Sequence, residues 1–376
     1  MSNTLARFVL YYFVYIILKY CAGNNVVIVD NSPFVGYNLS TCSYRQLCPD
    51  LKSALEQVSS SGRIEVKTGI YSGSNNTNLC AGGCSHISNI TLVGVDDACD
   101  QIEIRQTSGS TSDRAIYISN HTFREISCLK ISNFTFSEES QIEEGQNFEL
   151  GALSFTGNLF GGAAFIISNV TSLLISNVTF SDNKASCGGA ILVFRSIAVF
   201  RQCSFSYNTA SVVGGAMTIF HSNVQLDRSI FLNNTAVSTN LLTQYSTLGG
   251  AVYYSGGLQI LDGFHQTLLV SGCLFEINSA ERGGGAIYFV SISNFNNTFQ
   301  TTDSIFRNNI ANGLVSCLTV TSCTTRGGAL YLNTLSASIS NSEFVNNKAI
   351  GQSQQEVRIQ PSISLFLTHI YIHSAC

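Results

Sequence analysis

Apolar residues recur along this chain in pairs two positions apart, and each pair precedes a phenylalanine that is followed three residues later by an asparagine. Side chains that alternate in this way are typical of a β-strand. The phenylalanines are Phe155, Phe180, Phe205, Phe231, Phe275, Phe306 and Phe344, and the asparagines are Asn158, Asn183, Asn208, Asn234, Asn278, Asn309 and Asn347. A motif that recurs at about 25 residues predicts stacked repeats.

The residues around each phenylalanine predict the shape of one repeat. The positions seven and five before it are apolar in nearly every copy, and the positions four and three before it are mostly polar, which indicates a bend between two short strands. A third strand is expected after the Gly-Gly-Ala sequences that begin at Gly188, Gly214, Gly249, Gly284 and Gly327. At about 3.3 Å a residue, one repeat closes a coil, and coils stacked about 4.8 Å apart pair their strands in parallel. The pattern predicts an all-β fold, a right-handed parallel β-helix with three strands per rung and coils of about 25 residues.

The repeated residues have structural roles in this interpretation. Phenylalanine fills the interior, and the alanine two residues after six of the asparagines permits close approach inside a corner. The glycine pair supplies backbone angles that are closed to other residues, and asparagine tolerates the left-handed region and forms hydrogen-bonded ladders. We therefore assign none of the repeated residues to an active site. The insertions at 237–248, 255–265 and 312–326 lie between the fixed parts, where binding loops are expected.

The ends of the chain differ from the repeats. Residues 1–23 contain an apolar run at 8–18 and predict a signal peptide, with an uncleaved membrane anchor as the alternative. Residues 24–147 are expected to form an N-terminal cap and the first irregular coils, with a capping helix over 50–59 that begins at Asp50, and strands at 63–67, 87–95, 102–106 and 115–119. Regular repeats are expected over 148–349. No Gly-Gly-Ala follows Ala349, so 350–376 is expected to be an irregular or truncated tail.

The cysteines point to an oxidising compartment. The chain has 13 cysteines, and removal of Cys21 with the signal peptide leaves an even number. Candidate disulfides join Cys42 to Cys48, Cys80 to Cys84, and Cys317 to Cys323. Cys203 and Cys273 stand two rungs apart, about 9–10 Å, which is beyond the reach of a disulfide, so both are expected to be buried free thiols.

Sequons for N-glycosylation begin at Asn38, Asn75, Asn89, Asn120, Asn133, Asn169, Asn177, Asn233 and Asn296. Charged residues make up 11% of the chain against a typical 25%, and the net charge is −4. These features favour an extracellular or cell-surface protein that follows the secretory pathway. There is no basic stripe that would favour nucleic acid, and membrane association is expected only if the N-terminal segment is an uncleaved anchor.

The paired motifs Phe-x-x-Asn and Gly-Gly-Ala-(Ile/Leu/Val), over about 148–349, resemble the repeat of the chlamydial polymorphic outer-membrane proteins. That resemblance implies a right-handed β-helix displayed on a cell surface and used in adhesion. The N-terminal stretch, with a predicted helix and the sequence Lys67-Thr68-Gly69-Ile70-Tyr71, is similar to the opening of the pectin-lyase-like superfamily.

Three functions fit these observations. The first is adhesion, in which loops and strand faces bind proteins or glycans of another surface. The second is a polysaccharide lyase or hydrolase, which needs several converging carboxylates. Asp182, Asp227 and Asp303 lie in different rungs without a shared register, and the acidic cluster Glu138, Glu139, Glu143, Glu144 and Glu149 reads as a solvated loop. The third is a structural coat or wall protein. No catalytic residue, metal site or cofactor is predicted.

Overall fold

The computed structural model describes most of the chain outside its first 25 residues and several segments between strands. The described residues are 26–30, 47–80, 84, 86–95, 99–107, 110, 113–119, 122–136, 149–150, 153–154, 161–238, 247–257, 266–291, 297–312, 327–334, 336–350, 357–359, 364–368 and 371–373. The predicted signal peptide lies outside them. So do Asn38, Cys42, Asn120, Phe155, Asn158, Asn296, Cys317 and Cys323.

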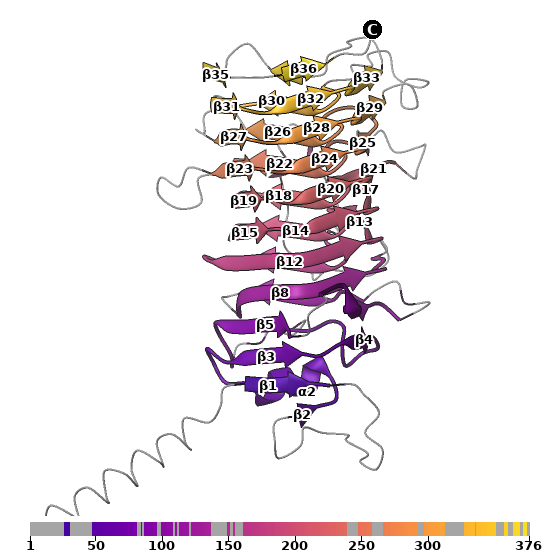
Figure 1. The fold of residues 1–376 in the computed structure, drawn as a ribbon, viewed down its shortest axis with the longest axis vertical. Coiled ribbons are helices and arrows are strands. Elements are labelled where there is room, and N and C mark those ends of the chain that lie inside the picture. Colours follow the sequence, from indigo (N-terminus) through magenta and orange to yellow (C-terminus); the bar gives the residue numbers. More distant parts are fainter. Residues whose placement is uncertain are drawn as a thin grey trace, which may run out of the picture.

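Short parallel strands stack along one long axis and form the walls of a parallel β-helix (Figure 1). A central rung consists of β14 (Ile191–Phe194), β15 (Ile197–Arg201), β16 (Ser204–Ser206) and β17 (Thr209–Val213). Each of these strands pairs in parallel with its counterpart in the next rung. The prediction of a parallel β-helix is therefore confirmed.

Three parallel sheets, here named A, B and C, make up the walls. In sheet B lie β7 (Ile116–Ser119), β11 (Phe165–Ser168), β14, β18 (Met217–Phe220), β22 (Val252–Gly256), β26 (Ile287–Ser291), β30 (Leu330–Asn333) and β34 (Val357–Ile359). In sheet C lie β13 (Lys184–Cys187), β17, β21 (Thr235–Ala236), β25 (Ser279–Ala280), β29 (Ile310–Asn312) and β33 (Lys348–Ile350).

Sheet A is the largest wall, because both strands that flank the predicted bend belong to it. Its first strands are β1 (Val26–Val29), β2 (Leu47–Cys48), β3 (Arg63–Val66), β4 (Gly69–Tyr71), β5 (Ile90–Gly94), β6 (Ile102–Arg105), β8 (Phe123–Ser132) and β12 (Leu173–Ser181). Before the bend follow β15, β19 (Asn223–Asp227), β23 (Thr267–Ser271), β27 (Thr298–Thr302), β31 (Ser336–Ser340) and β35 (Ser364–Thr368). After the bend follow β16, β20 (Ile230–Leu232), β24 (Leu274–Glu276), β28 (Ile305–Arg307), β32 (Glu343–Val345) and β36 (Tyr371–His373).

The third wall of the coil, sheet C, is built by residues that the sequence prediction placed in a turn. The two strands around the bend are one wall, and the strand after Gly-Gly-Ala is the second. The recurring alanine, expected inside a corner, lies instead in a strand of its own, where Ala210 pairs with Ala185 and Ala236. A regular rung therefore has four short strands in three sheets. The alanine strands are only two to five residues long, too short for an alternating pattern to reveal.

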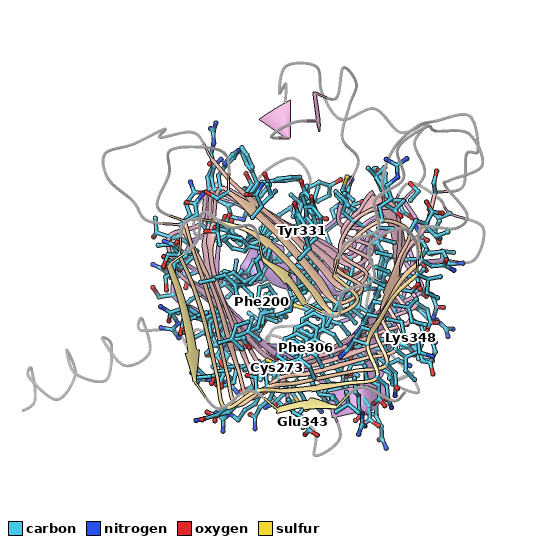
Figure 2. The ribbon with its side chains drawn as sticks, turned by 90° about the horizontal axis from the view of Figure 1, so that it is seen from above. Phe200, Cys273, Phe306, Tyr331, Glu343 and Lys348 are labelled. Carbon is cyan, nitrogen blue, oxygen red and sulfur yellow. A yellow bond between two sulfur atoms is a disulfide. The ribbon has the colours of Figure 1, made fainter. Side chains whose placement is uncertain are left out.

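The repeated phenylalanines form one continuous stack inside the coil, here called the Phe column. From Phe180 to Phe344 each ring lies 4.6–4.9 Å from the next, centroid to centroid, at interplanar angles of 3–8°. All of these side chains are buried. Seen down the axis, Phe200 and Phe306 lie inside the coil, whereas Glu343 and Lys348 lie on the outside of two different walls (Figure 2).

The repeated asparagines form a buried ladder, here called the Asn ladder. Asn208 donates from its backbone N–H and from Nδ2 to Oδ1 of Asn234, at 3.1 and 2.9 Å. Asn234 repeats both bonds to Asn278, and its Nδ2 also donates to the Phe205 carbonyl at 2.9 Å. The same pattern runs from Asn183 to Asn347. The ladder satisfies the corner's backbone groups, which have no strand partner.

The left-handed backbone is not at the ladder asparagines, which corrects the sequence expectation. The residue before each of them has positive φ, including Asp182, Tyr207 and Ile277 at 57°. The side chain of the ladder asparagine must point inward to reach the next rung, so the turn is made one residue earlier. The glycine prediction is confirmed: Gly188 has φ 60°, and a Cβ there would lie 2.0 Å from the carbonyl oxygen of Ile191.

The predicted capping helix is present as α2 (Leu51–Gln57). Its N-cap is Asp50, whose carboxylate accepts a hydrogen bond from the Ser53 backbone at 2.8 Å. Leu51, Ala54 and Leu55 are buried against the end of the core. The helix lies with β1 and β2 at the N-terminal end of the stack (Figure 1). It covers apolar surface that the next rung would otherwise cover.

The residue that neighbours Phe180 on the N-terminal side of the stack is not a phenylalanine. β12 pairs directly with β8, so that Phe180 has Ile131 as its neighbour. Between these strands, β9 (Glu149–Leu150) and β10 (Leu153–Ser154) pair antiparallel with each other rather than joining a wall. The motif at 155–158 lies outside the described residues.

The C-terminal segment also differs from its prediction as an irregular tail. β34, β35 and β36 pair in parallel with β30, β31 and β32 and continue the stack by one rung. Ile372 has the register position of the Phe column, opposite Phe344. Sequence inspection missed this rung because neither the phenylalanine nor a Gly-Gly-Ala marks it.

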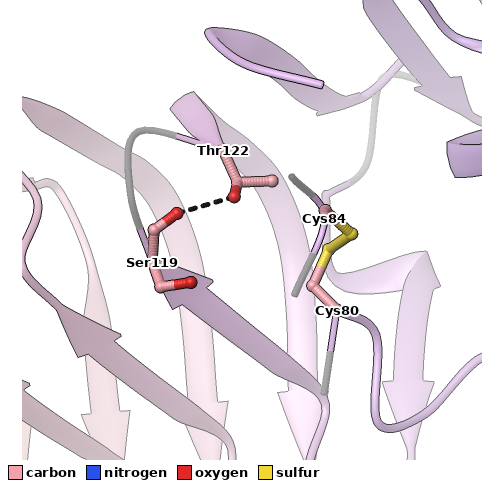
Figure 3. Close-up of a disulfide and its surroundings, with 4 residues drawn as sticks. All are labelled: Cys80, Cys84, Ser119 and Thr122. Atoms are coloured by element: carbon pink, nitrogen blue, oxygen red, sulfur yellow. Dashed lines mark hydrogen bonds between the residues drawn. A yellow bond between two sulfur atoms is a disulfide. The ribbon is translucent and has the colours of Figure 1, made fainter. Parts of the chain in front are cut away.

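Disulfides lie in the N-terminal coils. Cys80 and Cys84 form one of the three candidate bonds, beside a corner at which Thr122 Oγ1 donates to the Ser119 carbonyl at 2.7 Å (Figure 3). Cys99 and Cys128 form another, across 29 residues, which no local spacing indicates. Cys48 is disulfide-bonded as well.

The two central thiols are buried and free, as expected. Cys203 and Cys273 alternate with Ser229 in a column in which each backbone N–H donates to the side chain of the next rung. Burial raises the pKa of each thiol to about 12.

Candidate binding surface

The outer face of sheet A carries an exposed apolar strip, here defined as Ile230, Leu274 and Ile305. Each of these residues comes immediately before a residue of the Phe column, and successive strands pair them in register. Because side chains alternate along a strand, the buried phenylalanine forces its neighbour outward. Ile230 is 43% and Ile305 38% exposed, and Leu274 is half-buried. In the neighbouring rungs the same register position holds Ser204 and Glu343.

Ion pairs flank the apolar strip and neutralise the nearby charges. Arg307 contacts Glu276 at 2.8 Å on one side. On the other, Asp227 contacts Arg201 at 3.1 Å and Arg228 at 3.2 Å. These pairs are partly exposed, so they add little to stability. Their effect is to leave a flat, nearly neutral apolar surface with a polar border, a composition typical of protein interaction sites.

A second set of exposed residues lies at the corner between sheets A and C. This corner column consists of the left-handed residues Asp182, Tyr207, Asn233, Ile277, Asn308 and Asn346. Tyr207 is 52% and Ile277 47% exposed. A β-branched residue with positive φ is an outlier, since the left-handed region favours Gly, Asn and Asp. Strain of this kind tends to mark functional positions.

The outer face of sheet B is apolar but buried. Leu192, Phe194, Phe220 and Tyr253 form a second hydrophobic cluster outside the coil. Tyr253 and Tyr288 stack at 5.7 Å, and Tyr288 and Tyr331 at 4.4 Å. Burial raises the pKa of Tyr253, so its hydroxyl stays protonated at neutral pH. This face is therefore not a docking surface in the structure.

One half-buried histidine lies at the corner between sheets B and A. His221 has φ 48°, packs edge-on to Phe194 and has Nδ1 buried without a hydrogen bond. Burial, and secondly the charge of Arg195, lower the pKa of His221 to about 4. The ring is neutral at pH 7 and packs against Phe194, and no nucleophile is hydrogen-bonded to it among the described residues.

The described acidic residues do not converge. Asp227 is held by its two arginines, whereas Asp182 and Asp303 lie at left-handed turns in different columns. Within the described parts of the chain, no group of three His, Cys, Asp or Glu side chains is placed to hold a metal ion. Glu138, Glu139, Glu143 and Glu144 lie outside the described residues, as do the loop segments 239–246 and 313–326.

The described sequon asparagines lie on the surface, at Asn75, Asn89, Asn133, Asn169, Asn177 and Asn233. The apolar strip was not foreseen from the sequence. The sequence nevertheless contained the evidence for it. An isoleucine or leucine immediately before a buried phenylalanine of a strand must face outward, because side chains alternate between the two faces. Among the described residues, no helix is both long and apolar enough to cross a membrane.

Comparison with known families identifies the repeat. The model of the Chlamydia polymorphic membrane protein repeat matches residues 177–193 and 272–290. Each segment runs from just before a residue of the Phe column to just after Gly-Gly-Ala, and so covers the strand after the bend, the alanine strand and the sheet B strand of one rung. The chain carries this repeat. The parallel-strand fold is also consistent with the pectin-lyase-like superfamily.

A curated relative resembles part of the chain. The Metabotropic glutamate receptor-like protein R of Dictyostelium discoideum is 28% identical over 128 residues. The match covers 34% of this chain and 7% of the relative. No solved structure matches the chain.

Proposed function

We propose that this protein is a surface-displayed β-helix that binds proteins or glycans of another surface through the outer face of sheet A. The observation that carries the proposal is the apolar strip, in which the exposed Ile230 and Ile305 flank the half-buried Leu274 on three consecutive rungs. The membrane-protein repeat and the receptor-like relative support a surface location.

The construction of the wall suits it to binding. Behind the strip, the Phe column and the Asn ladder hold the strands that carry it in a fixed register. A partner that covers the strip gains apolar burial at about 25 cal/mol per Å² and orders little of this protein in return. A rigid face with few side chains to immobilise favours affinity for that reason.

The test compares isoleucines of equal chemistry on the same sheet. Ile230→Thr combined with Ile305→Thr removes apolar surface and keeps β-branched side chains that suit a strand. Ile197→Thr is the matched control, because Ile197 is 39% exposed on sheet A but lies on the far side of the bend. The secreted protein, residues 24–376, is applied to a glycan array and to whole cells.

We expect the double variant to lose binding at least tenfold and the control to bind like the wild type. Equal binding by all three proteins would move the site away from the strip. If the wild-type protein binds neither cells nor glycans, the structural coat role replaces adhesion. Release of uronide products in the same assay would favour the lyase or hydrolase class instead.

A further inference from the structure

The sequons of this chain coincide with the corners of its coil. Among the six described sequon asparagines, five have positive φ: Asn89, Asn133, Asn169, Asn177 and Asn233, at 52–61°. A left-handed corner residue points away from both adjoining strands, so its side chain reaches solvent without disturbing the core. The fold therefore presents these asparagines where a bulky modification can be accommodated.

Hydrogen bonding separates the six asparagines into two groups. Nδ2 of Asn75 donates to Asp50 at 3.2 Å, and Nδ2 of Asn133 and of Asn169 donates to the preceding serine hydroxyl at 3.1 and 3.2 Å. The side-chain amides of Asn89, Asn177 and Asn233 make no hydrogen bond within the described structure. Attachment of a sugar replaces one of the two hydrogens on Nδ2, so Asn89, Asn177 and Asn233 lose no hydrogen bond within the described structure when they are modified.

Asn233 has a further feature that the other two lack. Backbone hydrogen bonds from Tyr207 N–H to the Leu232 carbonyl and from Asn233 N–H to the Glu276 carbonyl, at 3.1 and 3.0 Å, stack its rung between those of Tyr207 and Ile277. Neighbours in a column are about 4.8 Å apart. The partly buried Asn233 side chain thus emerges between a tyrosine and an isoleucine that are each about half exposed.

We propose that Asn233 carries an N-linked glycan whose first sugar packs between Tyr207 and Ile277. The glycan would cover the apolar side chain of Ile277, which stays exposed at a left-handed position in a column otherwise made mostly of Asn and Asp. A sugar ring has an apolar face that can cover both side chains, which free water cannot do.

The chemistry requires a lipid pyrophosphate-linked oligosaccharide as donor. Nδ2 of Asn233 forms a bond to C1 of the first sugar, the bond from C1 to the pyrophosphate oxygen breaks, Nδ2 loses one proton, and the lipid pyrophosphate leaves. Thr235 completes the Asn233-Asn234-Thr235 acceptor sequence. The disulfides Cys80–Cys84 and Cys99–Cys128 fit the oxidising compartment in which this transfer occurs.

The first measurement is site mapping on the full chain secreted from eukaryotic cells. Peptide N-glycanase converts a glycosylated Asn into Asp, which mass spectrometry of the peptide around residue 233 detects. We expect conversion at Asn233 in the wild type and in Thr235→Ser, and none in Thr235→Ala, which keeps Asn233 itself. Serine is tolerated at this position, because Ser279 pairs with Thr235 in the next rung. An unconverted Asn233 in the secreted wild-type protein overturns the proposal, whatever the state of Asn89 or Asn177.

The second measurement tests the packing. Ile277→Asp gives the corner a residue that suits its backbone without creating a new sequon, and Asp182 already holds the equivalent position. Without the glycan, in the Thr235→Ala background, this substitution is expected to raise the unfolding midpoint. With the glycan it removes a packing partner, so the rise is expected to disappear or reverse. An equal rise in both backgrounds would show that the sugar does not contact Ile277.

Discussion

The N-terminal coils and the central rungs build the same walls by different means. In the central rungs identical residues face each other, so that Phe205, Phe231 and Phe275 stack within 5° of parallel. In the N-terminal coils the register neighbours are aliphatic, as where Ile104 pairs with Ile131, and covalent bonds join the corners. In a repeated rung, each side chain stacks on or hydrogen-bonds to the same residue of the next rung. In a coil without repeats, individual bonds such as disulfides take over this role.

Arg114 is the clearest example of such an individual interaction. Its buried guanidinium donates to the carbonyls of Gly161 and Gly162 at 3.2 and 3.0 Å and to the Tyr117 hydroxyl at 2.7 Å. It also lies 3.3 Å from the ring centroid of Phe136, and burial lowers its pKa. A single buried arginine thus does here what the Asn ladder does elsewhere, because it donates hydrogen bonds to the backbone carbonyls of the first glycine corner.

The largest expected effect comes from breaking the Asn ladder at its centre. Asn234→Ala leaves the Asn208 donors and the Phe205 carbonyl buried without a partner, which should cost about 3–5 kcal/mol of stability. Asn308→Ala is the control from the same corner column, and it should cost about 1 kcal/mol because only the left-handed preference is lost. Chemical denaturation measures both. Equal losses would show that the ladder contributes nothing beyond the corner itself.

Removal of a disulfide should weaken the other region by a similar but smaller amount. Cys99→Ser with Cys128→Ser opens a loop of 29 residues, and the expected loss is about 2–4 kcal/mol. Contacts in a solenoid run only between neighbouring rungs, so hydrogen exchange should quicken in β5, β6 and β8 and stay unchanged in β20–β28. Faster exchange throughout would mean that the two regions unfold as one unit.

A third variant should stabilise the central rungs. Thr301 takes the place of an inward apolar residue, opposite Val270 and Ile339, and its hydroxyl is buried without a hydrogen bond. Thr301→Val removes that unsatisfied group at nearly constant shape, so stability should rise by about 1 kcal/mol. Thr218→Val is the control, because the Thr218 hydroxyl donates to the Val213 carbonyl at 2.9 Å. A gain at both positions would contradict the explanation by hydrogen bonding.

The smallest effect is a pH dependence that belongs to the corner of His221. The pKa of His221 in the folded protein, about 4, lies below its ordinary value of 6.5. Between pH 4 and 6.5 the histidine is therefore protonated in the unfolded chain and neutral in the folded one. Stability should fall as the pH drops from 6.5 towards 4. His221→Asn tolerates the left-handed backbone and should flatten that slope in a thermal unfolding series. An unchanged slope would assign the pH dependence to carboxylates.

Local residue chemistry explains which predictions held. Residues at Phe, Asn and Gly-Gly positions meet copies of themselves about 4.8 Å away, so their spacing alone determines the column they join. The capping helix likewise has its apolar face and its Asp50 cap within one short segment. The Asn ladder was predicted as well, but the left-handed turn was placed on the wrong residue, because one residue cannot both reach inward and reverse the chain.

Register and burial were decided only by the tertiary structure. Phe180 has Ile131 of β8 as its neighbour, and Phe344 has Ile372 of β36, so two positions in the register of the Phe column hold no phenylalanine. The Cys99–Cys128 disulfide and the hydrogen bonds of Arg114 to the glycine corner join segments that are far apart in the sequence, so no local pattern predicts these contacts. The sequence by itself determined a β-helix and its columns, because repeated side chains pair with their own copies. The tertiary structure alone shows that Tyr253 is covered while the outward Ile230 and Ile305 stay exposed, because the burial of an outward side chain depends on what other segments pack over it.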